Sequence, residues 1–257
     1  MISLSHFVEF ERQSKHLTRI EELIGITDAI TESIGFRWFN LIRPSASTGR
    51  DSSILLTTYP ASWVERVFSE GRHLDDPIHA AVLRSVDGIQ WRDVGNIIDL
   101  NDYHKETLAL ASDHGLRNGF TVPFRLSGIP CAMFSVAIPQ LSEMEPQLIL
   151  AAKLLGGIVF AQAHRIVAEK FGQCEIVHLS PRQIDCIRLI ALGLSDYAIG
   201  AELGLSPETV REYVEGARQR YGVRRRTQLI AVAIRDGYLT VEEAVGWFRP
   251  RLDRSTE

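Results

Sequence analysis

The helix start and stop signals between residues 179 and 237 constrain the fold of this chain more than any other feature. Ser180 and Pro181, followed by Gln183, have the order of an N-cap, a proline at the first helical position and a capping box. Further capping residues and glycines predict four short helices, which begin near Ser180, Ser195, Ser206 and Arg226 and end near Gly193, Gly204, Gly222 and Gly237. This segment is therefore predicted to be a small all-α domain.

The second and third of these helices are joined only by Gly204-Leu205-Ser206, which is typical of a helix-turn-helix. In such a unit the third helix enters the major groove of DNA, and Val210 and Val214 mark its packed side. The opposite side and the arginines that follow supply the candidate DNA contacts, which are Glu208, Thr209, Arg211, Glu212, Glu215, Arg218, Arg224, Arg225 and Arg226.

These residue types suit a DNA surface in two ways. Arg211 can form two hydrogen bonds with guanine, and the glutamates can accept a hydrogen bond from cytosine. Thr209, Arg218 and the arginines at 224–226 suit phosphates. The alternative is a solvated helix with ion pairs four residues apart, such as Arg211 with Glu215.

Charge is unevenly distributed along the chain, and this distribution favours the DNA-binding interpretation. Residues 179–239 contain nine arginines and no lysine against seven acidic residues, a net charge of +2, whereas residues 1–178 have a net charge of −5. A locally basic module on an acidic body is expected of a small nucleic-acid-binding domain.

Segment 179–239 resembles the DNA-binding domain of LuxR-type transcriptional regulators over its whole length. The resemblance rests on LSPR at 179–182, ALG at 191–193 and LSPETVREY at 205–213. One departure is Gln183, which stands where the family has glutamate. A glutamine can still close the capping box, but any charged interaction of that glutamate is lost.

The N-terminal body is predicted to mix helices and strands. Helical periodicity covers residues 3–34, 61–70, 77–84, 102–114 and 145–170, and the strand-like segments are 36–42, 53–59, 120–126 and 132–138, of which the last two form a hairpin. The longest apolar run, 148–161, contains Lys153 and is too short to span a bilayer, so no membrane partner is expected. The three distant cysteines and the absence of a signal-peptide pattern predict a cytoplasmic protein.

The segment 59–79 combines aromatic, histidine and acidic residues, and three interpretations are open. The first is a metal site of a lactone hydrolase, whose ligands would be His73, Asp75, Asp76 and His79, although their spacing completes no ligand set. The second is structural, with Trp63 and Phe68 in the core and Asp76 as the cap of a helix that begins at Pro77. The third is a small-molecule pocket.

The resemblance to LuxR-type regulators continues here and favours the pocket. The spacing of Tyr59, Trp63, Asp76-Pro77, Trp91 and Gly119 is similar to that of the family's autoinducer-binding domain, so the resemblance covers about residues 5–239. It implies an α+β protein, in which an α-β-α sandwich around an antiparallel sheet is linked to a four-helix helix-turn-helix domain. It also implies that an N-acyl-homoserine lactone binds between the sheet and the helices.

The resemblance gives each polar pocket residue a role. Asp76 accepts the amide N–H of the ligand, the indole of Trp63 donates to the lactone carbonyl, and the hydroxyls of Tyr59 and Ser135 donate to the amide carbonyl.

Three further positions complete the expected pocket. Trp91 is expected to pack on the lactone ring, and Gly119 to let the backbone approach a helix. Val67 stands where the family commonly has an aromatic residue, which leaves extra room for a branched or aromatic acyl group. Alternatively, a neighbour such as Phe39 or Phe124 fills that room.

The sequence therefore predicts a cytoplasmic, homodimeric quorum-sensing regulator that is not an enzyme and needs no cofactor. Its expected partners are the lactone, operator DNA and, if it activates transcription, RNA polymerase. The alternatives are a regulator that senses a small molecule other than a lactone, and the metal-dependent hydrolase. The expected domains are residues 1–170 for the ligand, 171–178 as linker, 179–239 for DNA, and 240–257 as an extension in which Thr240 begins another helical turn.

Overall fold

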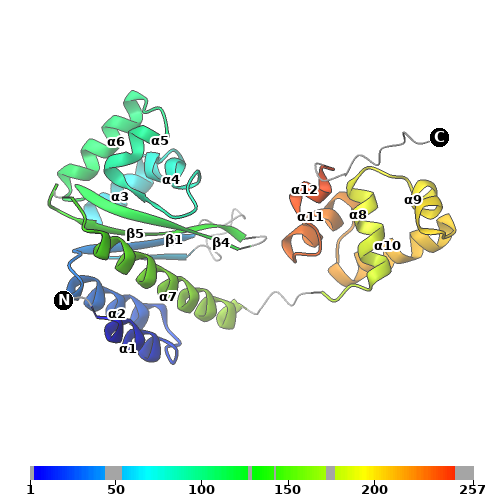
Figure 1. Ribbon diagram of the computed structural model, residues 1–257, viewed down its shortest axis with the longest axis horizontal. Coiled ribbons are helices and arrows are strands. Elements are labelled where there is room, and N and C mark those ends of the chain that lie inside the picture. The colour runs from blue at the N-terminus through cyan, green and yellow to red at the C-terminus, as the bar shows by residue number, and fades with distance from the viewer. Residues whose placement is uncertain (1–2, 44–53, 127–128, 142, 172–176, 247–257) are drawn as a thin grey trace. The chain divides into compact units, whose positions relative to one another are not determined.

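The computed structural model describes residues 3–43, 54–126, 129–141, 143–171 and 177–246 (Figure 1). The chain forms two compact units, the first from Met1–Arg125 with Pro130–Gln173 and the second mainly from the residues after Cys174.

The first unit is built on a five-stranded sheet with the strand order β2-β1-β5-β4-β3. The strands are β1 (Trp38–Arg43), β2 (Ile54–Thr57), β3 (Ile89–Gln90), β4 (Asn118–Leu126) and β5 (Ile129–Ile138). Strand β1 pairs with β2 and with β5, and β3 pairs with β4, in each case antiparallel. Asn40 pairs with Thr57 on one side and with Ser135 on the other, so these three residues form a row across the sheet.

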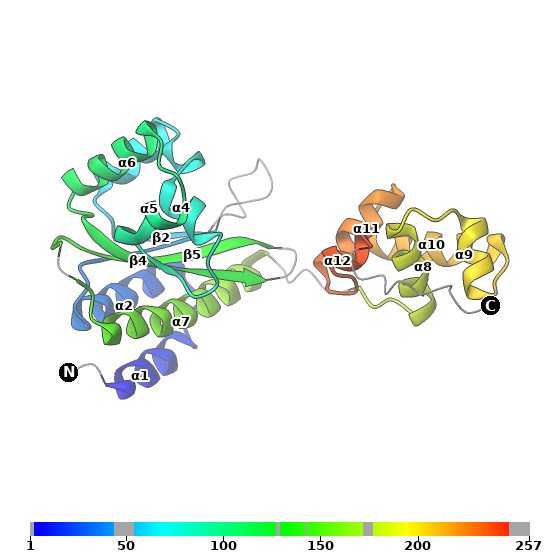
Figure 2. The same ribbon diagram turned by 45° about the horizontal axis from the view of Figure 1, so that its top comes forward.

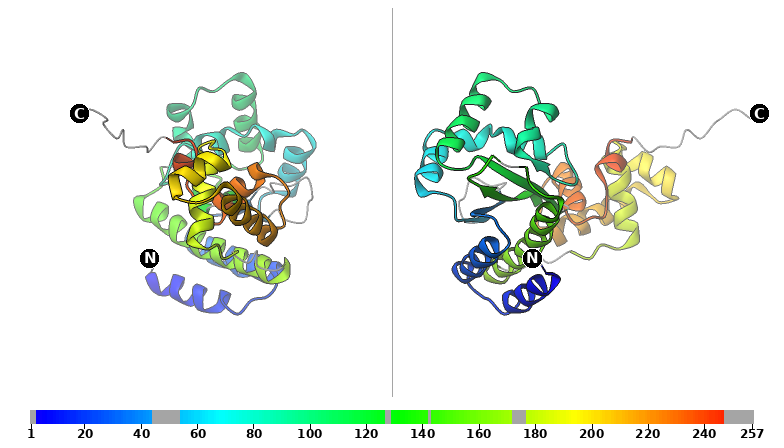
Figure 3. Two further views of the ribbon diagram at one scale, coloured as in Figure 1. Left: turned by 90° about the vertical axis from the view of Figure 1, so that its right-hand side faces the viewer. Right: turned by 60° about the vertical axis from the view of Figure 1, so that its left-hand side comes forward.

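Helices cover both faces of this sheet, and the views in Figures 1, 2 and 3 show the same three layers. One face is covered by α2 (Ile20–Ser33) and α7 (Pro146–Phe171), and α1 (Leu4–Ser14) packs on the outer side of these two helices. The other face is covered by α3 (Ala61–Ser69), α4 (Pro77–Val82), α5 (Val94–Ile97) and α6 (Asp102–Asp113). Two short 3-10 helices, η2 (Arg72–Leu74) and η3 (Trp91–Asp93), precede α4 and α5. The α-β-α sandwich with an antiparallel sheet is confirmed.

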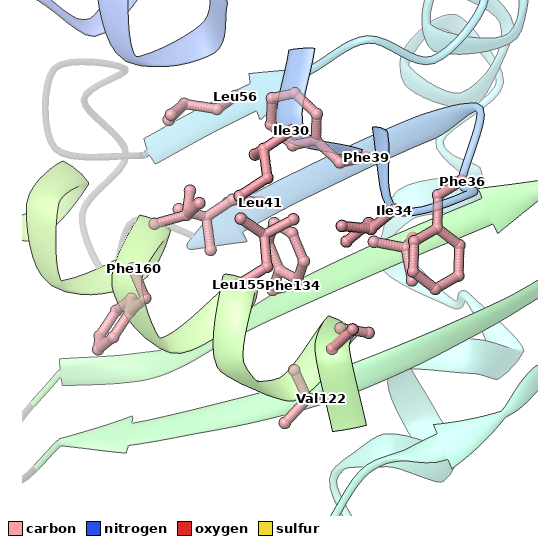
Figure 4. Packing of buried hydrophobic residues seen from close by; sticks show 14 of the residues in the cluster. Ile30, Ile34, Phe36, Phe39, Leu41, Leu56, Val122, Phe134, Leu155 and Phe160 are labelled. Atoms are coloured by element: carbon pink, nitrogen blue, oxygen red, sulfur yellow. The ribbon is translucent and has the colours of Figure 1, made fainter. Parts of the chain in front are cut away.

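The core lies between the sheet and the helices α2 and α7 (Figure 4). Successive side chains of a strand point to opposite faces, so Phe39 and Leu41 of β1 face this core and are fully buried. The rings of Phe39 and Phe134 stack with centroids 6.1 Å apart. The same alternation turns Asn40 and Ile42 toward the opposite face, under α3, α4 and α6.

Helix α7 is, within the described residues, the one helix long and apolar enough to cross a membrane. Its residues Ala152, Leu155 and Val159 are fully buried in the core of the first unit. The helix therefore packs as the core helix of this domain.

The helical pattern predicted for residues 3–34 is interrupted, and α1 and α2 are separate helices. The carbonyls of Ser14 and Leu17, which lie at this interruption, accept hydrogen bonds from Arg165 Nη2 at 3.2 and 2.7 Å. The strand β3 and the helices η2, η3 and α5 were not predicted, because each is only two to four residues long. Of the predicted linker 171–178, residues 172–176 lie outside the described residues.

The second unit consists of α8 (Pro181–Ala191), α9 (Asp196–Leu203), α10 (Pro207–Tyr221), α11 (Arg226–Arg235) and the single turn α12 (Val241–Ala244) (Figure 2). The hydroxyls of Ser180, Ser195 and Ser206 accept backbone N–H groups at the starts of α8, α9 and α10. The predicted four-helix domain is confirmed, with its helix ends at the predicted caps.

The turn between α9 and α10 is tight, and its geometry depends on two glycines. Gly204 ends α9 with φ of 67°, a left-handed conformation that favours glycine. A Cβ on Gly200 would lie 2.6 Å from the carbonyl oxygen of Leu205, so only glycine allows the turn to pack on α9. This close approach fixes the angle between the two helices of the helix-turn-helix.

The predicted extra turn after residue 239 is α12, which Thr240 and Glu243 begin with a capping box. Glu243 also approaches Arg188 of α8 to 3.8 Å. Residues 247–257 of this extension lie outside the described residues.

Candidate functional site

A cavity of about 290 Å³ lies on the face of the sheet opposite to the core. Its floor comes from β1, β2 and β5, and its walls come from α3, α4, α6 and the segment around Trp91. Six of the seven predicted pocket residues line it, namely Tyr59, Trp63, Val67, Asp76, Trp91 and Ser135. Further lining residues that the sequence did not single out for the pocket include Asn40, Thr57, Thr107 and Arg117.

A chain of hydrogen bonds orders the floor beside β4. Trp91 Nε1 donates to Thr121 Oγ1 at 2.9 Å, and Thr121 Oγ1 lies 2.9 Å from Ser135 Oγ. When the Thr121 hydroxyl donates to Ser135, the hydroxyl hydrogen of Ser135 is available to the cavity. Thr121 was not predicted, because only the fold brings it next to Trp91 and Ser135.

Gly119, the seventh predicted residue, does not line the cavity and lies beneath the indole of Trp91. A Cβ at this position would lie 2.5 Å from Cε2 of that indole. The expected close approach is therefore made by the tryptophan side chain and not by a helix. Glycine lets the indole lie flat on β4, where its N–H reaches Thr121.

Tyr59 and Trp63 offer hydrogen-bond donors that the described part of the protein leaves unused. The Tyr59 hydroxyl is buried and has no hydrogen-bond partner of good geometry among the described residues. Burial also raises the pKa of this phenol, so the group remains a neutral donor. The ring of Trp63 packs against His114, Leu116 and Ala137, and its indole N–H makes no hydrogen bond within the described structure.

Asp76 combines the structural role with a place in the cavity wall. Its Oδ1 accepts the backbone N–H groups of Ile78 and His79 at 2.8 and 3.1 Å, which caps α4 in front of Pro77. Both bonds use the same oxygen, so the second carboxylate oxygen, Oδ2, can accept a hydrogen bond from a ligand. The structural and the ligand-binding interpretations of Asp76 are therefore compatible.

A buried arginine holds the segment between α3 and α4 against α6. Arg72 is only 6% exposed, and its Nε contacts Glu70 at 2.6 Å while Nη1 donates to Thr107 Oγ1 at 3.0 Å. Its guanidinium also lies 5.0 Å from the ring centre of Tyr103. Arg72 thereby fixes the loop that carries Asp76. Nothing in the local sequence distinguishes it from a surface arginine.

The residues of the metal interpretation are used in other contacts. His73 packs on Phe68 with ring centroids 4.7 Å apart, and Asp75 pairs with His104 at 3.1 Å. No group of three histidine, cysteine, aspartate or glutamate residues in the described segments is placed to hold a metal ion.

Val67 lies in the wall of the cavity. Phe39 stacks on Phe134, and Phe124 stacks on Phe160 with centroids 4.9 Å apart, so both rings lie in the core on the far side of the sheet. The alternative in which one of them fills the space at Val67 is therefore wrong.

The predicted DNA-binding residues differ in how their side chains contact the rest of the domain. Glu208, Arg211 and Glu212 are exposed on α10 and form no ion pair or hydrogen bond through their side chains among the described residues. Arg218, in contrast, contacts Glu215 at 2.8 Å and the carbonyl of Arg224.

Arg226 also forms contacts within the domain. It pairs with Asp196 of α9 at 2.8 Å and donates to the carbonyl of Leu194 at 3.3 Å. Thr209 lies in the first turn of α10, and its Oγ1 is 3.1 Å from Ser206 Oγ. Arg224 and Arg225 lie between α10 and α11.

Gln183 closes the capping box of α8, as predicted. Ser180 N donates to Gln183 Oε1 at 3.0 Å, and Gln183 N donates to Ser180 Oγ at 3.3 Å. The side-chain Nε2 of Gln183 also donates to the carbonyl of Tyr213 in α10 at 3.4 Å. The glutamine therefore connects α8 to the helix predicted to enter the DNA groove, through a donor that glutamate lacks.

Comparisons with known protein families match both units. Residues 19–163 match the family described as Autoinducer binding domain, and residues 177–233 match Bacterial regulatory proteins, luxR family. Together with the cavity and the exposed face of α10, these matches define a two-domain bacterial transcriptional regulator with a small-molecule-binding domain. The chain belongs to the LuxR family.

Relatives of similar length share this organisation. The chain is 26% identical over 263 residues to the HTH-type quorum sensing-dependent transcriptional regulator VjbR of Brucella ovis, covering 94% of this chain and 97% of VjbR. It is 23% identical to the transcriptional activator protein VanR of Vibrio anguillarum, covering 89% and 95%. A crystal structure of Escherichia coli SdiA superposes with a TM-score of 0.64 at 21% identity, covering 90% of this chain and 98% of SdiA, which shows the shared fold.

Proposed function

We propose that this protein is a quorum-sensing transcription factor that binds an N-acyl-homoserine lactone in the cavity and operator DNA through α10. The observation that carries the proposal is the set of unused polar atoms that line the cavity. They are the hydroxyl of Tyr59, the indole N–H of Trp63 and Oδ2 of Asp76. Two donors and one acceptor converge on an otherwise largely apolar space.

An acyl-homoserine lactone has the complementary groups. Its amide N–H donates to Oδ2 of Asp76, its lactone carbonyl accepts from Trp63, and its amide carbonyl accepts from Tyr59 and Ser135. The apolar acyl chain then runs along the cavity wall. Extra room at Val67 accommodates a branched or aromatic acyl group next to the amide.

Ligand binding is converted into a DNA response through the stability and assembly of the protein. A ligand that binds only the folded state stabilises that state. We further propose a homodimer, since helix-turn-helix regulators place two recognition helices about one DNA turn apart. The exposed side of α7 supports this, because Leu150 and Leu154 lie there with exposures of 60% and 41%. An activating dimer would contact RNA polymerase.

The same proposal assigns the chain its domains and its lack of catalysis. Residues 1–170 bind the ligand, 171–178 link the domains, 179–239 bind DNA, and 240–257 extend the DNA-binding domain. The unused groups of the cavity bind and orient a ligand, and none of them is paired with a base that would activate a nucleophile. The protein acts in the cytoplasm, where DNA and a membrane-permeant lactone both reach it.

The experiment is a titration of the full-length protein with a panel of acyl-homoserine lactones. Calorimetry measures the affinity, and the shift of the thermal unfolding midpoint measures the stabilisation by each ligand. Binding of at least one lactone supports the proposal. A solved structure of SdiA contains octanoyl-rac-glycerol, so 1-octanoyl-glycerol is the comparison ligand. Binding of the acylglycerol with no binding of any lactone would replace the proposal with a regulator of non-lactone acyl lipids. Mass spectrometry of small molecules that copurify with the protein identifies the natural ligand.

A further inference from the structure

Asn40 occupies the centre of the cavity floor. It lies on the central region of β1, paired with Thr57 of β2 and with Ser135 of β5. Its sequence neighbours Phe39 and Leu41 are fully buried in the core on the other face, so strand alternation turns the Asn40 side chain into the cavity, which it lines.

The side-chain amide of Asn40 differs from its polar neighbours because it has no partner within the described segments. Thr57 Oγ1 accepts the backbone N–H of Tyr59 at 3.1 Å, and Ser135 Oγ lies 2.9 Å from Thr121 Oγ1. No described residue forms a hydrogen bond with the Asn40 side chain. A half-buried residue therefore presents one acceptor and two donors to the ligand space.

The register places this amide beside the subsite for the ligand's own amide. Residues paired across antiparallel strands have Cβ atoms about 5 Å apart, so Asn40 is one residue spacing from Ser135. Ser135 and Tyr59 are the donors proposed for the amide carbonyl of the ligand. The carbon two bonds beyond that carbonyl, C3 of the acyl chain, then lies within reach of the Asn40 amide.

We propose that Asn40 selects acyl-homoserine lactones that carry an oxygen at C3, as a 3-oxo or a 3-hydroxy group. This inference rests on the proposed function and adds the ligand class. Tyr59, Trp63 and Asp76 account for the two carbonyls and the amide N–H of a plain acyl-homoserine lactone. Such a ligand therefore offers no hydrogen-bond partner to Asn40. A methylene at C3 would cover the amide and leave it without a hydrogen bond, which is unfavourable in a water-excluded site.

The test compares three lactones of equal chain length that carry CH2, C=O or CHOH at C3. Wild-type full-length protein is expected to bind at least one oxygenated lactone about three- to tenfold more tightly than the plain one, the range of one neutral hydrogen bond. Asn40→Leu, which has a similar size and no polar atom, is expected to remove this preference. Asn40→Ala serves the same purpose should the leucine variant fail to fold, as judged by circular dichroism.

Thr57→Val is the matched control, since Thr57 lines the same floor but uses its hydroxyl within the protein. This variant is expected to change the affinity for all three lactones by the same factor. Equal wild-type affinities for the three lactones, or a preference that survives in Asn40→Leu, would overturn the inference and leave the proposed function standing. Failure of all three lactones to bind would count against both the inference and the proposed function.

Discussion

Replacing Asp76 by asparagine separates the two roles of this residue, and it gives the sharpest test of the cavity. Asparagine is as good an N-cap as aspartate, and its Oδ1 can accept the same two N–H groups that Asp76 Oδ1 accepts at 2.8 and 3.1 Å. The second oxygen becomes an NH2 group, which faces the amide N–H of the ligand as donor against donor. We therefore expect Asp76→Asn to fold normally and to lose ligand affinity.

The loss of binding free energy should be about 1.5–3 kcal/mol, the value of a hydrogen bond to a charged group. This corresponds to a dissociation constant raised about 10- to 150-fold. Asp76→Ala also removes the cap and should destabilise the ligand-free protein by a further ~1 kcal/mol. Calorimetric titration gives the affinity, and thermal unfolding without ligand gives the stability.

Asp75→Asn is the control for this experiment, since Asp75 is the adjacent acid but does not line the cavity and pairs with His104 at 3.1 Å. It should leave ligand affinity near the wild-type value. Wild-type affinity in Asp76→Asn would refute the ligand role of Asp76. A ligand-free midpoint lowered as much in Asp76→Asn as in Asp76→Ala would show that the substitution acts through folding.

Four further variants test other parts of the structure. Gly119→Ala places a methyl group 2.5 Å from the indole of Trp91, which lies over this position. It should destabilise the first domain by about 1–3 kcal/mol and change tryptophan fluorescence. Unchanged thermal unfolding would show that the indole moves aside without penalty. Arg211→Ala should weaken binding to the operator by about 1–3 kcal/mol with little effect on random DNA. Alanine at both Arg224 and Arg225 should instead weaken binding to all DNA sequences and reduce the dependence of affinity on salt concentration. Gel shifts at two salt concentrations test this division, and a uniform loss of affinity in both variants would contradict it. Val67→Tyr adds a ring beside the proposed amide subsite, so it should weaken the binding of a lactone with a branched or aromatic acyl group more than that of a straight-chain lactone. Equal changes of affinity in calorimetry would disprove that the acyl group uses this space.

Local interactions explain which parts of the fold the sequence could predict. The caps at Ser180, Ser195 and Ser206 involve residues within three positions of each other, so the sequence shows both partners at once. Asp76 in front of Pro77 is another such pair. The helix-turn-helix and the cap of α4 were therefore predictable to within a residue or two.

The contacts that the sequence could not predict join residues far apart in the chain. Trp91 and Thr121 are thirty positions apart, and Arg72 and Thr107 thirty-five, so no local pattern connects them. Arg165 donates a hydrogen bond to the carbonyl of Ser14, the last residue of α1, across 151 positions. Such contacts depend on the sheet register and on helix packing, which only the folded chain defines.

The arginines of the DNA-binding domain show the same limit. Their number and spacing predicted phosphate contacts for Arg218 and Arg226 together with their neighbours. In the folded domain these two residues bind the carbonyls of Arg224 and Leu194, respectively, and acidic residues of the same domain. Sequence spacing therefore indicated a basic surface, but it could not separate arginines that build the domain from those that remain free for DNA.

The unused polar groups of the cavity also explain why ligand binding should control the state of this protein. A buried group without a hydrogen bond reduces the stability of the folded domain by about 1–3 kcal/mol, and the Tyr59 hydroxyl is one such group. A lactone that accepts from Tyr59 and Trp63 and donates to Asp76 removes this penalty while it fills the cavity. At a ligand concentration one hundred times the dissociation constant, binding adds about 2.7 kcal/mol to the stability of the folded state. Because the carboxylate of Asp76 caps α4 and is also the proposed acceptor for the ligand amide, this gain would act directly on the helices that cover the sheet.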